Sequence, residues 1–321
     1  MRSILQAILF SSLMLLIGCQ NMMIGATGAL IYDSTEGIER ENNLENFEKG
    51  ILGNLLLVEG LLSLKPEDSN LLVSLTKGYA GYTFSVLETH YLRDYYADKF
   101  PSPYKKKIIE YYSRSLKYGL RFFKANGITF EDLKKSLREN KFNELLDKKL
   151  DLSDRDLEGV VFTGHSLGGL INFQKGKMSI VTYAPLAKAM FDWSCKKNPN
   201  IGNGICDIFF GAYEASRPRG LGGRPEIGKN YFLNMIVKHP NNWLGRVAYM
   251  QYYLIPYVDE VGYLEQKNFM EKALKLHEKE LFWSPRELKE KDVFSNKRLR
   301  LYQTIAVERF KIMKKFEEDL F

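Results

Sequence analysis

The sequence predicts an all-α protein: stacked helix hairpins of degenerate tetratricopeptide-like repeats that form an α-solenoid-like bundle. Three observations lead to this prediction. Apolar residues recur at three- and four-residue steps through most of the chain, as they do on one face of a helix. The stretch from Leu44 to Leu150 contains no convincing strand. A small residue, an aromatic residue and a proline also recur at the spacing typical of tetratricopeptide repeats.

The first residues have the features of a lipoprotein signal peptide. A short positive start precedes the apolar run Ile4–Ile17, which is shorter than the roughly 20 residues that a membrane-spanning helix needs. The run ends in Gly18-Cys19, so we predict cleavage before Cys19 and lipid attachment to its sulfur; the alternative is an ordinary buried cysteine. The predicted parts are a signal peptide (1–18), a lipid-anchored linker (19–45) and a helical-repeat domain (46–321).

Helical periodicity defines the elements of the repeat domain in order. Pro66 ends the first helix and implies a helix hairpin with the second, because proline cannot continue a helix. The expected helices are Asn46–Leu64, Asn70–Thr89, Pro103–Lys124, Thr129–Leu146, Leu186–Lys196, Ile205–Ala215, Pro225–Lys238, Trp243–Tyr253, Leu264–His277 and Lys297–Leu320.

The repeat signal lies in the second half of the chain. A small residue and a phenylalanine precede a proline at the same two distances in two places, namely Ala187 and Phe191 before Pro199, and Gly228 and Phe232 before Pro240. One hairpin of this kind cannot bury its own apolar face. Stacking of hairpins therefore supplies the core and leaves a concave surface on which a partner can bind.

Composition narrows the range of functions. The chain has 45% hydrophobic residues and 13% aromatic residues, which excludes disorder, and its net charge of +7 comes from lysines spread along helices. Nucleic-acid binding is therefore not expected. Cys195 and Cys206 lie on either side of a predicted turn and form either a disulfide or two free thiols. No cysteine or histidine cluster suggests a metal site.

One motif suggests an enzyme. Gly164-His165-Ser166-Leu167-Gly168 matches the nucleophile elbow of lipases and esterases, in which a strand leads into the serine. Under this alternative, a membrane-anchored serine hydrolase would use Ser166 as its nucleophile. The strands would be residues 160–162 and 179–183, and the acid and base would come from Asp192, Asp207 or Asp259 and from His239 or His277.

The surroundings of the motif argue against that alternative. A hydrolase sheet needs alternating strands and helices before the elbow, whereas helix follows helix here. Residues 223–229 have the spacing of a phosphate-binding loop, but Asn230 stands where Ser or Thr is required, and a helix start explains them better. We therefore expect no catalytic residue and no cofactor.

Several segments resemble one family in their order and spacing. These are the Gly18-Cys19 site, the helical run Asn54–Glu88, the segment 162–172, and the segment 204–232 with Gly-Ala-Tyr-Glu-Ala-Ser-Arg-Pro at 211–218. Together they resemble the TatT family, the T component of tripartite ATP-independent periplasmic (TRAP) transporters. The family has a tryptophan where Leu167 stands, so the resemblance to a serine elbow arises within a family motif that needs no nucleophile.

The resemblance implies a function without catalysis. It implies a lipoprotein with tetratricopeptide-like units that self-associates as a homotrimer, binds the ligand-binding P subunit and takes part in ligand import, with hydrophobic molecules as candidate ligands. The lipid on Cys19 would hold it on a bacterial membrane, inner or outer, facing the periplasm. A repeat scaffold for envelope assembly without a transport role is a third hypothesis.

The candidate binding residues follow from the matched segments and from aromatic spacing. Asn172, Tyr213 and Arg217 lie in those segments, and Arg217 has the planar donors that bind a carboxylate or a phosphate in bidentate fashion. It has a structural alternative, the capping of a helix C-terminus. Tyr249 and Tyr252 share a helix and could line a groove, although aromatic residues at this spacing also build cores.

Overall fold

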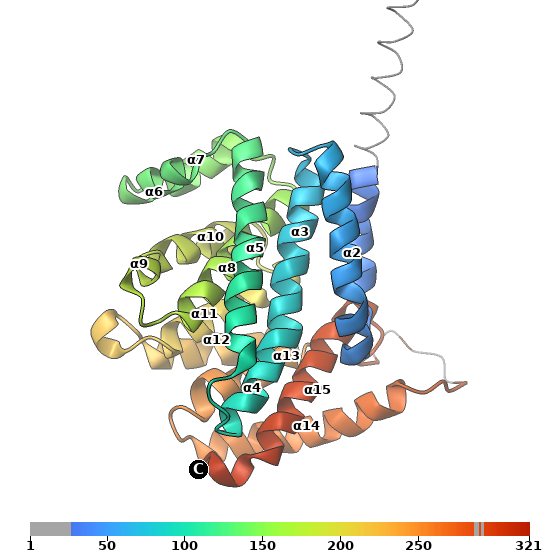
Figure 1. Cartoon of the computed structure of the whole chain (residues 1–321). Coiled ribbons are helices and arrows are strands. Elements are labelled where there is room, and N and C mark those ends of the chain that lie inside the picture. The colour runs from blue at the N-terminus through green and yellow to red at the C-terminus, as the bar shows by residue number, and fades with distance from the viewer. Residues whose placement is uncertain (1–26, 286–288, 290–291) are drawn as a thin grey trace, which may run out of the picture.

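The structure, a computed structural model, describes residues 27–285, 289 and 292–321. Its all-α class confirms the prediction, since no strand occurs among the described residues and the structure is 77% helical (Figure 1). The predicted signal peptide and Cys19 lie outside the described residues. Residues 27–38, within the predicted linker, form a helix.

The helices follow one another with short connections. The first half of the chain contains α2 (Leu44–Leu64), α3 (Ser69–Tyr82), the π-helical turn η1 (Thr83–Leu87), α4 (Glu88–Tyr96), α5 (Pro103–Ala125), α6 (Phe130–Arg138), α7 (Phe142–Lys149) and α8 (Asp154–Phe173). The second half contains α9 (Met178–Val181), α10 (Ala184–Lys197), α11 (Ile205–Ala215), α12 (Pro225–Lys238), α13 (Leu244–Tyr249), the π-helical turn η4 (Met250–Leu254), α14 (Glu260–Glu280) and α15 (Arg300–Lys315). Short 3-10 turns are η2 (Ile201–Asn203), η3 (Arg219–Leu221), η5 (Lys297–Leu299) and η6 (Glu317–Asp319).

Polar side chains fix where the helices begin. Asn43, Asp68, Ser102 and Ser153 accept hydrogen bonds from backbone N–H groups in the first turns of α2, α3, α5 and α8. Thr129 forms a reciprocal capping box at the start of α6. The single helix predicted from Thr129 to Leu146 is therefore two helices, and a left-handed backbone at residue 140 separates them.

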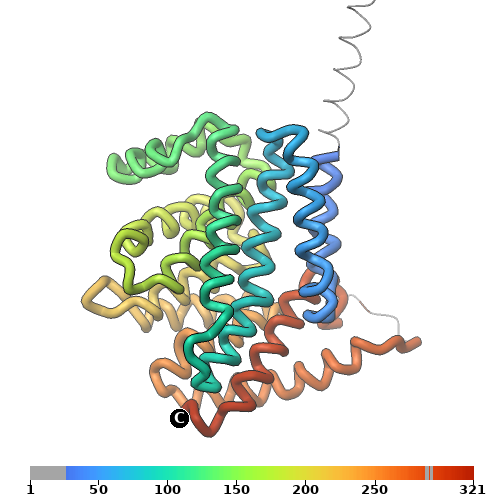
Figure 2. The backbone as a smooth tube through the Cα atoms, in the orientation of Figure 1, coloured from blue at the N-terminus to red at the C-terminus, as the bar shows by residue number. Residues whose placement is uncertain are grey.

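The core forms where successive helices pack together. Figure 2 shows α2, α3 and α5 side by side, and α8 packs on both α3 and α5 and carries α10 on its other side. Gly119 of α5 makes close approach possible, because a Cβ there would collide with the hydroxyl oxygen of Thr163 in α8. The hairpin predicted around Pro66 is present as α2 and α3.

The residues that suggested repeats lie at helix contacts. Phe191 and Phe232 are fully buried, on α10 and α12. Gly228 of α12 lies against α11, where an added Cβ would be 2.8 Å from the carbonyl oxygen of Gly211. These contacts are compatible with stacked hairpins, and the repeat assignment itself stays a prediction.

Buried charges fasten the helix at residues 27–38 to the rest of the molecule. The Lys77 ammonium lies 3.0 Å from Glu39 and 2.8 Å from Glu158, whose carboxylate also accepts a hydrogen bond from the Tyr32 hydroxyl. Burial opposes the charge on Lys77, but Glu158 and Glu39 outweigh it and raise the pKa of the amine. The end of the predicted linker is therefore tied to α3 and α8, while the boundary at residue 46 stays a prediction.

Candidate functional site

Two π-helical turns lie in the interior of the bundle. Turn η1 continues α3 into α4, and turn η4 ends the helix that begins with α13. In η1 the backbone N–H of Glu88 reaches back five residues to the carbonyl of Thr83. Such turns are rare in proteins and often occur at functional sites, because they shift the helix register and redirect side chains.

Arg309 of α15 joins the two turns. Its guanidinium donates to the carbonyl oxygen of Phe84 in η1 at 2.5 Å and to the side-chain oxygen of Gln251 in η4 at 3.4 Å. It also donates to the hydroxyl of Thr89 at 3.1 Å and lies 4.2 Å above the Phe84 ring. The side chain is 2% exposed, so these partners replace water around a buried charge.

Glu88 supplies the opposite charge. Its carboxylate lies 3.6 Å from the Arg309 guanidinium and accepts a hydrogen bond from the Tyr112 hydroxyl at 2.6 Å. Burial raises the pKa of Glu88, while Arg309 and Tyr112 oppose that shift. Burial and the neighbouring Glu88 raise the pKa of Tyr112 well above its usual value, so this hydroxyl stays a donor.

Aromatic rings border this cluster. The His165 ring lies 5.4 Å from the ring of Phe84 and 5.7 Å from that of Tyr112. Burial, with a smaller contribution from Arg309, lowers the pKa of His165 to about 4, so the imidazole is neutral at pH 7. Its Nδ1 is buried, and no partner for it occurs in the described part of the chain.

Two half-buried side chains, His165 and Tyr252, lie next to this cluster. The charge of Arg309 acts on both of them. Burial and Glu88 raise the pKa of Tyr252, and Arg309 opposes that shift, which places this tyrosine beside the charged pair. The arrangement offers rings and a few polar atoms, a combination that suits the binding of a partly apolar molecule.

The nucleophile-elbow interpretation of Ser166 is wrong. Residues 160–162, expected as a strand under that alternative, lie within α8, and residues 178–181 form the short helix α9. Ser166 is fully buried, donates to the carbonyl of Phe162 at 2.9 Å and lies 2.6 Å from the hydroxyl of Ser115. A nucleophile elbow exposes its serine on a sharp turn, whereas this serine is bonded inside a straight helix.

Arg217 is occupied by local structure. Its guanidinium donates to the carbonyls of Tyr213, Leu221 and Gly222 at 3.0 to 3.3 Å and lies 3.8 Å above the Tyr213 ring. It also pairs with the buried Glu214 at 3.3 Å. Glu214 in turn accepts two hydrogen bonds from Arg224, and mainly these lower its pKa. The structure thus favours the capping alternative for Arg217, with Tyr213 stacked beneath it.

The other candidates have different surroundings. Tyr249 is buried between the rings of Phe232 and Tyr253, as expected for a core residue. Asn172 is half-buried near the end of α8. Of the five predicted residues, Tyr252 is the one that borders the interior cluster.

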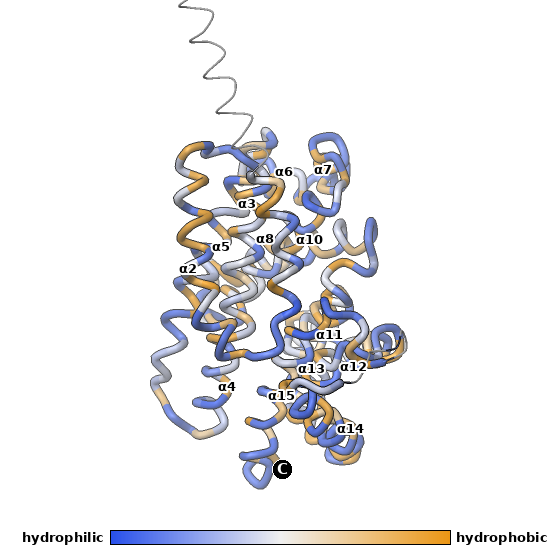
Figure 3. Tube along the Cα trace, turned by 90° about the vertical axis from the view of Figure 1, so that its right-hand side faces the viewer, coloured by the Kyte–Doolittle hydropathy of each residue, from blue (hydrophilic) through white to orange (hydrophobic). Residues whose placement is uncertain are grey.

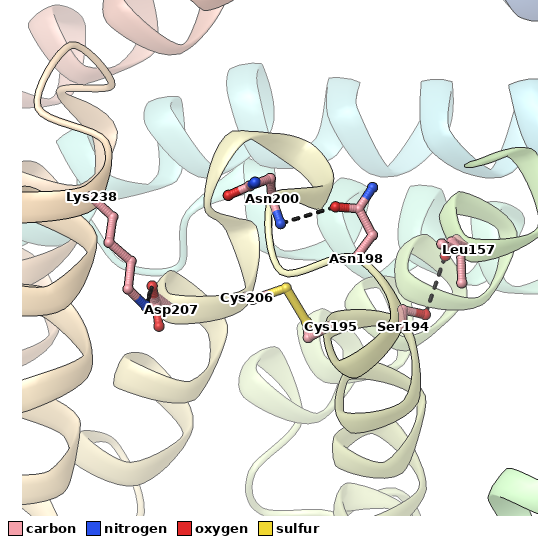
Figure 4. The surroundings of a disulfide bond; sticks show 8 residues. All are labelled: Leu157, Ser194, Cys195, Asn198, Asn200, Cys206, Asp207 and Lys238. Atoms are coloured by element: carbon pink, nitrogen blue, oxygen red, sulfur yellow. Dashed lines mark hydrogen bonds and ion pairs between the residues drawn. A yellow bond between two sulfur atoms is a disulfide. The ribbon is translucent and has the colours of Figure 1, made fainter. Parts of the chain in front are cut away.

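The structure resolves the alternatives for the two later cysteines. Cys195 at the end of α10 and Cys206 at the start of α11 form a disulfide, with Cα atoms 5.9 Å apart (Figure 4). Next to it the Ser194 hydroxyl donates to the carbonyl of Leu157 and so ties α10 to α8. The bond closes the connection between α10 and α11.

Sequence reasoning missed the pair Arg309 and Glu88. The two residues lie far apart in the chain, in the helices expected at Asn70–Thr89 and Lys297–Leu320. One signal was present: Arg309 falls on the same helix face as the buried residues Ile305, Ala306 and Met313. A charge on an apolar face indicates a buried partner.

The fold and this site define a helical-bundle protein with a buried charge pair that aromatic side chains border. Among the described residues, no group of acidic, cysteine or histidine side chains could hold a metal ion. The chain belongs to the TRAP transporter T-component family, whose model matches residues 40–281. That family forms part of a transport system of the bacterial envelope.

The family match gives the chain a place in transport as an accessory subunit of a TRAP transporter. No curated protein matches the sequence. Over the described residues, none of the helices has the length and apolar character required to cross a membrane.

Proposed function

We propose that this protein is the lipid-anchored T subunit of a TRAP-type uptake system, in which it binds the ligand-binding P subunit and self-associates as a homotrimer. The match to the T-component family carries the proposal. Lipidation of Cys19, after an apolar run too short to span a membrane, would hold the protein on the envelope facing the periplasm. The anchored protein would then stay at the membrane, where the P subunit can bind it.

The aromatic side chains beside Arg309 and Glu88 support a part in ligand transfer. His165 and Tyr252 offer flat apolar surfaces together with one neutral nitrogen and one hydroxyl. Arg309 and Glu88, whose charges act on Tyr252, form an ion pair with each other. A partly hydrophobic ligand would therefore enter more readily than a multiply charged one, because it has little hydration to lose.

The P subunit tests the proposal directly. We expect the full lipidated chain in detergent to bind the purified P subunit of the same transporter in calorimetry, and light scattering to give a mass of three chains. A chain that is monomeric and also fails to bind the P subunit would refute it.

Ligand transfer needs a separate measurement. We expect Tyr252→Ala to change the binding of hydrophobic ligands in native mass spectrometry and to leave P-subunit binding intact. Tyr249→Ala, a core change on the same helix, is the matched control for general destabilisation. Equal ligand binding by Tyr252→Ala and the unchanged protein would exclude the surroundings of Arg309 and Glu88 as the ligand site.

A further inference from the structure

The outer face of α2 is apolar and uncovered. Leu56, Leu57 and Leu64 are 58% to 65% exposed on this helix. The run of residues 50–64 contains one charged residue, Glu59, which is turned toward α5 and bonded there. Figure 3 shows hydrophobic stretches along α2 at the edge of the molecule. We call Gly53, Leu56, Leu57, Gly60 and Leu64 the α2 face.

The glycines of the α2 face have no explanation inside the described structure. A Cβ added at Gly53 or Gly60 would meet nothing within 4 Å, whereas a Cβ at Gly78 of α3 would collide with Leu55. Glycine inside a helix costs about 1 kcal/mol relative to alanine. Gly53 and Gly60 each carry this cost, and no packing contact within the described structure offsets it. We take this as a sign that another backbone approaches this face closely.

A basic stripe runs beside the α2 face. Lys106, Lys117, Arg121 and Lys124 are exposed on the outer side of α5, where Glu110 is the one acidic residue of that helix. The three lysines form no ion pair within the part of the chain that the structure describes. We call these four residues the α5 stripe.

Contacts between the two helices place these surfaces side by side. Glu59 of α2 pairs with Arg114 of α5 and accepts a hydrogen bond from Tyr118 at 2.6 Å. One turn further along α5, the Arg121 guanidinium donates to the carbonyl of Pro66 at the end of α2. The α2 face and the α5 stripe therefore form one surface, with an apolar half and a positive half.

We infer that this surface docks an acidic protein that places apolar side chains between the leucines of α2. A second copy of this chain would bring one α5 stripe against another, and like charges oppose that arrangement. A membrane gains from inserted apolar side chains but gains nothing from glycines at Gly53 and Gly60. A partner backbone gains from both the leucines and the glycines, and its acidic residues would pair with the lysines.

The inference rests on the proposed function, because it identifies the P subunit as the acidic partner. The test is binding of the purified P subunit to the full lipidated chain in detergent. We expect Leu57→Asp, and separately Lys117→Glu with Lys124→Glu, each to weaken binding at least tenfold. We also expect higher salt to weaken binding by the unchanged protein more than by the lysine variant, because fewer charge pairs remain to be screened.

Matched controls come from α14, which packs on α15 and η4. Leu276→Asp and Lys275→Glu change exposed residues of the same types there, and we expect neither to alter binding. All five substituted positions are exposed, so the thermal unfolding midpoint should stay the same and separate lost binding from lost folding.

Each outcome decides between the two proposals. A chain that binds the P subunit, with unchanged affinity in the α2 and α5 variants, would overturn the docking surface and leave the proposed function standing. A chain that does not bind the P subunit would overturn both. Variants that lose self-association or binding to anionic vesicles while they keep the P subunit would show that a second copy or a membrane covers this surface instead.

Discussion

Removal of Arg309 tests whether the buried charge pair organises the interior. In Arg309→Met, Glu88 would keep the Tyr112 hydroxyl but lose its opposite charge at 3.6 Å. The carbonyl of Phe84 would lose a donor at 2.5 Å. Breaking one partner of a buried pair typically costs about 3 to 5 kcal/mol, because the remaining charge is uncompensated. We expect a loss of about 4 kcal/mol in the free energy of unfolding.

The double variant separates the interaction energy between Arg309 and Glu88 from the contribution of each residue alone. Glu88→Gln leaves Arg309 charged and unpaired, and we expect it to cost about 3 kcal/mol. Glu88→Gln together with Arg309→Met leaves no lone charge, so it should cost about 4 kcal/mol instead of the sum of about 7, a coupling of about 3 kcal/mol. Urea unfolding of the four proteins at pH 7 measures this.

The result that would refute the reasoning is additivity. If the double variant lost the sum of the two single losses within about 0.5 kcal/mol, Arg309 and Glu88 would act independently and the pair would not organise the site. Glu308→Gln is the control, since this neighbour on α15 pairs with Lys311 at the surface and should cost under about 1 kcal/mol.

Three further predictions concern single positions. His165 has a pKa of about 4 in the fold and about 6.5 when unfolded, so the unfolded chain binds more protons between these values. As pH falls from 7 to 4, protonation of His165 in the unfolded chain should remove about 3 kcal/mol from the free energy of unfolding. In denaturant unfolding, His165→Phe should lose about 3 kcal/mol less over this pH range than the unchanged protein does. Equal losses in the two proteins would contradict the prediction. Gly228→Ala should destabilise by about 2 kcal/mol because its Cβ would meet the Gly211 carbonyl, whereas Gly60→Ala should stabilise by about 1 kcal/mol. Thermal unfolding shifts of the same sign would contradict this pair. Ser166→Ala should cost about 1 kcal/mol, and a fluorophosphonate probe should not label the unchanged protein; labelling that depends on Ser166 would restore the hydrolase.

Local pattern predicted most of the fold. The helices expected at Ile205–Ala215 and Pro225–Lys238 begin and end where the structure has them. Prolines and capping residues act on the helix end next to them, so the sequence alone predicts those helix ends. Among the helices that were not predicted are the one at residues 27–38 and α8, whose glycines and β-branched residues have low helix propensity. Packing overrides propensity there: a Cβ at Gly159 would lie 2.8 Å from the Phe122 ring, and one at Gly164 would lie 2.9 Å from Met190.

The candidate site was less predictable, for a physical reason. Arg309 and Phe84 are 225 residues apart, and a single sequence carries no signal for a contact between them. Tyr252 was found through aromatic spacing, but the same spacing also selected Tyr249, which the structure places in the core. Spacing shows that two residues share a helix, but it does not show which of them lies beside the buried charge pair.

Glycines illustrate how far sequence reasoning reaches in this chain. Gly164 seemed to belong to an enzyme motif, Gly228 to a repeat, and Gly60 to neither. The structure separates them by what a Cβ would meet: Gly164 and Gly228 lie against other helices, and Gly60 faces open space. The first two are accounted for by the fold, so they need no chemistry. Gly60 lowers helix stability, and no contact within the described structure requires a glycine there. For that reason it indicates a binding partner.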